Sequence, residues 1–267
     1  MWLDTALHQA TGLHSFTPER QLRLLPVASH AGPGDVDTTL ELLWQVCANL
    51  QRLSYPVVVL DGTARETEAQ PGLAQLLGGM PWPEDSANAA GLADSLAVVP
   101  AARGLALLAR RGSAAMQPPL NAALRSYALA VLYAPVELLA PLVAGNTGVP
   151  LVMMGPAAQG LVGAYRQLKH LALHAGLPAC TVASVQPVGA RQRPRQTAEA
   201  LATLQRSAQE QLGLRVHTTT IAAAHMQDIQ RLTLQLLENA CTIDAGLPLP
   251  ALHDLDAATP SFLEQSH

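Results

Sequence analysis

The first loop of the chain reads Ser29-His30-Ala31-Gly32-Pro33-Gly34-Asp35-Val36-Asp37-Thr38-Thr39. It follows the short apolar run Leu22–Val27 and precedes a segment with helical periodicity, Leu40–Leu53. A strand, a loop with glycines, two threonines and a helix N-terminus is the order in which phosphate-cradling loops occur. This order predicts an α/β domain whose ligand site lies where the first strand ends.

The rest of the chain repeats the alternation of short apolar runs and longer helical segments. Six further runs are Val57–Leu60, Leu96–Val99, Ala128–Tyr133, Val149–Met154, Cys180–Val185 and Val216–Ile221. The clearest later helical segments are Ala157–Ala175, Gln196–Leu212 and Ala222–Ala240. Continuous apolar strands joined by helices predict a mostly parallel sheet of about seven strands, covered on both faces. The fold class is therefore α/β, a three-layer sandwich.

The composition narrows the class of protein. Of the 267 residues, 49% are apolar and 13% charged, which excludes a disordered chain and favours a partner for the sparsely charged surface. The net charge of -4 argues against a generic nucleic-acid binder. The cysteines Cys47, Cys180 and Cys241 lie in apolar segments, as in a reduced cytoplasmic protein. No run of 18 apolar residues predicts a membrane span.

Three regions are expected along the chain. Residues 1–20 form an N-terminal helix and linker, residues 21–245 the α/β domain, and residues 246–267 a proline-containing, loosely ordered tail. Within the domain, Gln70–Asn88 is rich in Gly and Pro and predicts a loop with one short helix.

Four motifs, in this order, resemble those of one ATPase family. They are Gly32–Thr39 in the loop, Leu60–Thr63 after the second strand, Val99–Gly104 after the third, and Gly160–Lys169 on a later helix. Together they resemble the MinD/ParA superfamily of deviant P-loop ATPases, most of all its FlhG branch, which regulates flagellar number. The resemblance covers residues 6–240 and implies a P-loop NTPase fold of the MinD type.

The loop departs from that family where the chemistry resides. Asp37 stands at the position of the P-loop lysine and Gly32 at that of the family's second lysine, and the chain contains a single lysine, Lys169. A unit charge about 4 Å from a phosphate oxygen contributes ~4 kcal/mol at an effective dielectric of ~20, and aspartate reverses its sign. Phosphate binding in the family's manner is therefore not expected, and no cofactor is predicted.

Other positions of the same site are altered as well. Asp61 is retained, but Thr63 replaces the second acid of its motif, and Tyr133 stands where the family has its Mg²⁺-linked aspartate. The adenine-reading asparagine is lost around Ala183-Ser184. The predicted degenerate nucleotide site comprises Gly32, Gly34, Asp37, Thr38, Thr39, Asp61 and Tyr133. In the alternative interpretation these residues serve structure only, with Asp61 in a turn and Thr38 and Thr39 as helix N-caps.

The N-terminal segment resembles the element by which FlhG proteins bind the signal-recognition-type GTPase FlhF. Apolar residues of Trp2 to Leu13 share one helical face, with Gln9 at its border. The resemblance implies that this helix docks on an FlhF-like GTPase and that Gln9 acts at the GTPase site. The predicted contact residues are Leu3, Leu7, His8, Gln9, Ala10, Leu13 and His14. The alternative is that the segment packs on its own domain.

The sequence therefore predicts an FlhG-like pseudo-ATPase, a non-catalytic cytoplasmic regulator that an FlhF-like partner recruits to the cell pole. No nucleic-acid partner and no nucleotide-dependent dimer are expected, and the acidic tail disfavours membrane binding. Two alternatives stay open. One is a MinD-like accessory of pilus positioning or cellulose secretion, and the other is a hydrolase with a rewired site that uses arginines such as Arg103.

Overall fold

A computed structural model describes residues 22–29, 36–80, 96–155, 158–186, 194–222 and 225–242. The strands are β1 (Arg23–Ala28), β2 (Val57–Asp61), β3 (Ala97–Pro100), β4 (Leu129–Ala134), β5 (Leu151–Met154), β6 (Ala179–Gln186), β7 (Arg215–Ala222) and β8 (Cys241–Thr242). The helices are α2 (Val36–Arg52), α3 (Leu73–Leu77), α5 (Ala102–Arg111), α6 (Ser113–Ala123), α7 (Val136–Val143), α8 (Ala158–Ala175), α9 (Pro194–Leu212) and α10 (Met226–Asn239).

Seven strands form a parallel sheet in the order β3-β2-β4-β1-β5-β6-β7. The short β8 is antiparallel and pairs with the start of β1, at Arg23 and Leu24. β5 pairs with the other end of β1, at Val27 and Ala28, so β8 and β5 share one side of that strand. The predicted α/β fold with about seven mostly parallel strands is confirmed.

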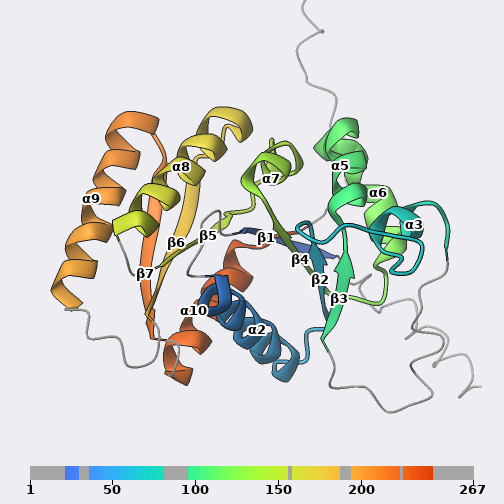
Figure 1. Ribbon diagram of the computed structural model, residues 1–267, viewed down its shortest axis with the longest axis horizontal. Helices are drawn as coiled ribbons and strands as arrows, with labels where there is room; N and C mark the ends of the chain where they lie inside the picture. The colour runs from blue at the N-terminus through green and yellow to red at the C-terminus, as the bar shows by residue number, and fades with distance from the viewer. Residues whose placement is uncertain are drawn as a thin grey trace, which may run out of the picture.

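Helices cover both faces of the sheet unequally. In Figure 1, α2 and α10 lie below the sheet, whereas α3, α5, α6, α7, α8 and α9 lie above it. Each face has its own apolar core, because successive side chains of a strand point to opposite faces. In β4, Ala130 and Leu132 face the larger helical layer, while Val131 and Tyr133 face α2 and α10.

The helix predictions need two corrections. The segment Ala222–Ala240 is not one helix, because Ala222 ends β7 and α10 begins only at Met226. The helix after the first loop begins at Val36, four residues ahead of the predicted Leu40. The expected short helix in Gln70–Asn88 is present as α3, and residues 81–95 lie outside the described part.

The predictions for the two ends of the chain, for membrane spans and for the cysteines have different outcomes. Residues 1–20 and 246–267 lie outside the described ranges, so their predicted roles stay predictions. None of the helices described is long and apolar enough to cross a membrane. Cys47 and Cys180 are buried as predicted, and burial raises the pKa of each thiol to about 12.

Candidate functional site

The candidate site lies where β1, β2 and β4 end. From β1 the chain continues into α2 on one face of the sheet, and from the adjacent β4 it continues into α7 on the other face. Neighbouring strands whose connections leave to opposite faces open a crevice at their carboxyl ends, the usual ligand position in parallel α/β sheets. The register places Tyr133 beside both Val27 and Asp61 at this point.

Asp61 ends β2, and its carboxylate is bound within its own turn. The Thr63 hydroxyl donates to Asp61 Oδ1 at 2.6 Å, and the Thr63 backbone N–H donates to the same oxygen at 2.9 Å. The residue that replaces the family's second acid therefore acts as a donor to the first. This arrangement supports the interpretation of Asp61 as a turn residue.

Tyr133 belongs to the core rather than to a polar crevice. Its side chain is only 5% exposed and lies in the apolar cluster between the sheet and the α2–α10 layer. Its backbone carbonyl accepts a hydrogen bond from Gly62 N–H at 2.7 Å, which holds the turn after β2 against β4. A Cβ at Gly62 would lie 2.6 Å from the Ala134 side chain, so this close approach requires glycine.

The glycine loop between β1 and α2 is only partly described. Gly32 and Gly34 lie outside the described residues. Asp37, Thr38 and Thr39 lie in the first turn of α2, which begins at Val36, so the expectation that the threonines are N-caps is wrong. Thr39 is fully buried.

The sequence analysis missed the most extensively bonded carboxylate of this region. Glu66, in the loop after β2, is 1% exposed and accepts hydrogen bonds from Arg103 N–H at 2.7 Å and Gly104 N–H at 2.7 Å, in the first turn of α5. It also accepts one from Ala74 N–H, in the first turn of α3, at 3.3 Å. The backbone donors where a phosphate could sit on α5 are thus taken by the chain's own carboxylate.

Gly72 and Gly104 permit this arrangement. A Cβ at Gly72 would lie 2.0 Å from Pro100 O, and one at Gly104 would lie 2.7 Å from the Leu73 side chain. No sequence pattern distinguishes Glu66 from the exposed Glu68 nearby. Gly104, in contrast, belongs to the motif Val99–Gly104 that carries part of the family resemblance.

A second unforeseen contact fixes the start of the glycine loop. Gln167 on α8 is 5% exposed, and its Nε2 donates to Ser29 O at 2.6 Å, while Ser29 N–H donates to Ala134 O at 2.8 Å. The only lysine, Lys169, lies two residues further on α8 and is exposed. The sequence singled out this helix but not the role of Gln167.

The predicted partner-binding residues stay a prediction. Leu3, Leu7, His8, Gln9, Ala10, Leu13 and His14 lie outside the described part of the chain. Among the residues described, no group of three or more His, Cys, Asp or Glu side chains is placed to hold a metal ion. Asp61 at the end of β2 is thus engaged by Thr63, Ser29 after β1 by Gln167, and the first turn of α5 by Glu66.

Comparisons with known proteins add little to this geometry. A scan against models of protein families finds no match, and a search of curated proteins finds none either. Among solved structures, the chain is similar to a ParA family ATPase from Chlorobium tepidum TLS, at 14% sequence identity and a TM-score of 0.44. The likeness covers 81% of this chain and 92% of that chain. Similarity this low carries no conclusion about activity, so function is argued from the residues themselves.

Proposed function

We propose that this chain is an FlhG-like pseudo-ATPase, a non-catalytic regulator of flagellar placement or number that acts through protein contacts. The observation that supports it best is the state of the candidate site. Asp61 is bonded by Thr63, the first turn of α5 is bonded by Glu66, and Tyr133 is buried. A site built to hold a nucleotide presents such groups to the ligand rather than to itself.

The charge distribution supports the same proposal. Phosphoryl transfer depends on cations that neutralise the developing charge, supplied by a loop lysine, by metal ions or by arginine. Asp37 occupies the position of the loop lysine. Lys169 is exposed on α8, two residues after Gln167, whose side chain donates to Ser29 O after the end of β1. Arg103, the arginine suggested for a rewired site, is exposed on α5, and its backbone N–H donates to Glu66.

Nucleotide binding is the first test. Calorimetric titration of the full chain with Mg-ATP and with Mg-GTP is expected to give no saturable heat up to millimolar nucleotide. Asp37→Lys is the informative variant, because it removes the repulsive charge and supplies the missing one. We expect it to remain without micromolar affinity, since the carboxylate of Asp61 and the donors of α5 stay engaged. Micromolar binding by the unmodified chain would contradict the proposal.

Partner binding is the second test, and it concerns the N-terminal segment. An amphipathic helix that docks by one apolar face is disrupted by a charge on that face. Leu7→Glu is therefore expected to weaken binding to an FlhF-type GTPase by at least about tenfold, whereas Thr5→Glu, off the stripe, is the matched control. Gln9→Ala is expected to keep docking and to reduce any stimulation of GTP hydrolysis. Binding that survives removal of Met1–Phe16 would refute the docking proposal.

A further inference from the structure

The strand β7 forms one edge of the sheet, and no strand in the described part of the chain pairs with its outer side. Arg215 N–H donates to Pro178 O, toward β6, at 3.0 Å. Because backbone groups alternate in direction along a strand, Val216, Thr218 and Thr220 turn their N–H and C=O groups outward. Val216 is only 3% exposed, whereas Thr218 is partly exposed and Thr220 exposed, so two successive outward positions are available for a further strand.

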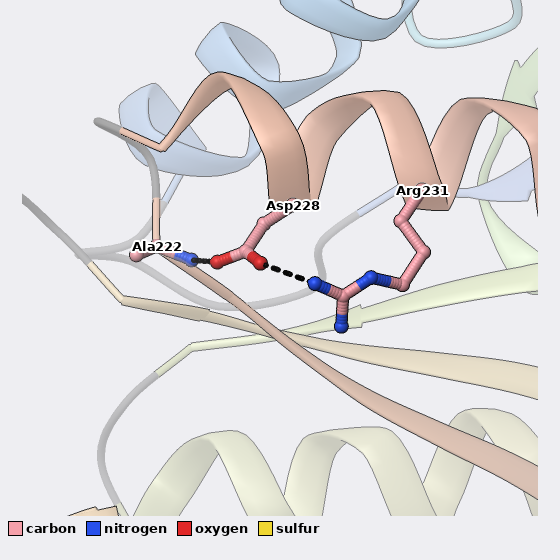
Figure 2. Close-up of polar contacts among 3 residues, drawn as sticks. All are labelled: Ala222, Asp228 and Arg231. Atoms are coloured by element: carbon pink, nitrogen blue, oxygen red, sulfur yellow. Dashed lines mark hydrogen bonds and ion pairs between the residues drawn. The ribbon is translucent and has the colours of Figure 1, made fainter.

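The two ends of this outer edge are closed by the chain itself. At one end, Leu214 N–H donates to Ala208 O at 3.3 Å. At the other end, Ala222 N–H donates to Asp228 Oδ2 at 3.4 Å, and Ala222 O accepts from His225 N–H at 2.9 Å. Figure 2 shows Asp228 between the Ala222 backbone and Arg231, which binds its second oxygen at 3.1 Å. Folded proteins commonly block edge strands against pairing, and between these two blocks Thr218 and Thr220 pair with no strand of the described residues.

A groove of about 490 Å³ lies beside the start of this stretch. Helix α9 supplies one wall and β7 the other. The lining side chains that the argument uses are Gln205, Arg206, Gln209 and Glu210 on α9, and Arg215 and Val216 on β7. A groove between a helix and an open edge strand is the arrangement in which extended peptides add to a sheet, with main-chain hydrogen bonds for affinity and side-chain pockets for specificity.

The charges of the groove select the partner. Arg206 and Arg215 are both exposed, and Glu210 is the one carboxylate in the lining. The ion pairs found among the described residues join Arg195 to Glu199 and Arg231 to Asp228, and neither lies in the groove. Two guanidinium groups against one carboxylate favour a ligand that carries acidic side chains.

We propose that the groove of β7 and α9 binds an extended acidic segment of a partner protein, which pairs with Thr218 and Thr220 as a new edge strand. A second copy of this chain suits the groove less well. Antiparallel pairing of two β7 strands joins two edges that carry the same charges. It also brings no acidic residue of β7, since that strand carries only Arg215 and His217 as ionisable groups.

The test uses a fluorescein-labelled peptide of alternating Glu and Val, six residues long. We expect saturable binding by fluorescence anisotropy, with amide shifts at Thr218 and Thr220 in NMR spectra. Two control peptides carry Lys in place of Glu, or N-methyl groups on alternate amides, and both are expected to bind at least about tenfold more weakly.

Variants locate the peptide on the protein. Thr218→Pro removes an outward N–H without touching the ladder to β6, so the fold is expected to persist and peptide affinity to fall about tenfold or more. Thr218→Val is the matched control, because it keeps the N–H. Arg206→Glu and Arg215→Glu are each expected to weaken the acidic peptide about three- to tenfold and to strengthen the Lys peptide. Arg111→Glu, exposed on α5, is expected to change neither.

Three results would overturn this proposal. One is a dissociation constant above about 1 mM for the acidic peptide. Another is an affinity that is the same for Thr218→Pro and Thr218→Val, both verified as folded by circular dichroism. The third is sedimentation of the free protein as a dimer that Thr218→Pro dissociates, which would assign the edge to a second copy. None of these bears on nucleotide or GTPase binding, so the functional proposal is tested separately.

Discussion

Replacing Glu66 with alanine is expected to destabilise the fold more than any exposed substitution in the same loop. The change removes a carboxylate that is 1% exposed and leaves the N–H groups of Arg103, Gly104 and Ala74 without their acceptor. Hydrogen bonds to a charged group contribute about 1.5–3 kcal/mol each, and the two bonds at 2.7 Å are the strong ones. Desolvation of the buried carboxylate offsets part of this. We expect a net loss of about 3–5 kcal/mol.

Urea denaturation followed by circular dichroism measures the loss, and the melting temperature is expected to fall by about 10 °C. Glu68→Ala is the matched control, because Glu68 is exposed in the same loop and its loss is expected to cost less than about 0.5 kcal/mol. Glu66→Gln keeps the shape but turns an amide nitrogen toward at least one N–H donor, so about 2 kcal/mol is expected. If Glu66→Ala and Glu68→Ala unfold within about 0.5 kcal/mol of each other, the clamp does not stabilise the fold and the reasoning fails.

Three further predictions follow from burial and close packing. Gly104→Ala is expected to cost at least about 2 kcal/mol, because its Cβ would lie 2.7 Å from α3, whereas Gly163→Ala meets nothing within 4 Å and is expected to gain up to ~1 kcal/mol of helix propensity in the same denaturation assay. Burial raises the pKa of Cys47 and of Cys180 from 9.0 to about 12, so the folded state retains protons that the unfolded thiols release. Stability is therefore full below about pH 9 and falls as pH rises toward 12, by up to ~1.4 kcal/mol per pH unit for each thiol; a constant urea midpoint from pH 8 to 10.5 would contradict this. Gln167→Leu leaves the carbonyl that follows β1 without its donor and is expected to lower the unfolding free energy by about 1–3 kcal/mol, measured against an exposed Gln→Leu variant on α9.

The positions of the strands along the chain were accessible from the sequence, because apolar runs of a buried parallel sheet are nearly continuous. Each predicted run overlaps its strand, and the first one, Leu22–Val27, is displaced by a single residue from β1. Helices α6 and α7 were not predicted. Pro118 and Pro119 lie inside α6 and Pro141 inside α7, and proline in a helix interior is normally a sign against helix.

The positions of the candidate-site residues were predictable from the sequence, but their hydrogen-bond partners were not. Parallel strands bring their carboxyl ends to one edge, so the proximity of Asp61 and Tyr133 follows from their places at the ends of predicted strands. The partners of the polar groups could not be foreseen. Glu66 bonds to Arg103, 37 residues away in the sequence, and Gln167 bonds to Ser29, 138 residues away. Local periodicity carries no information about such distant pairs. These contacts depend on how the layers pack.

The two proposals rest on one physical contrast between regions of the same sheet. At the ends of β1 and β2, the polar groups are bonded internally, so a ligand there would have to break hydrogen bonds of about 1 kcal/mol each or more before forming its own. Along the outer edge of β7, Thr218 and Thr220 pair with no strand of the described residues, and a groove lies beside the start of that edge. A partner strand exchanges only water for hydrogen bonds at that edge. This contrast is the physical reason for both proposals, and the nucleotide titration and the peptide assay test its two halves separately.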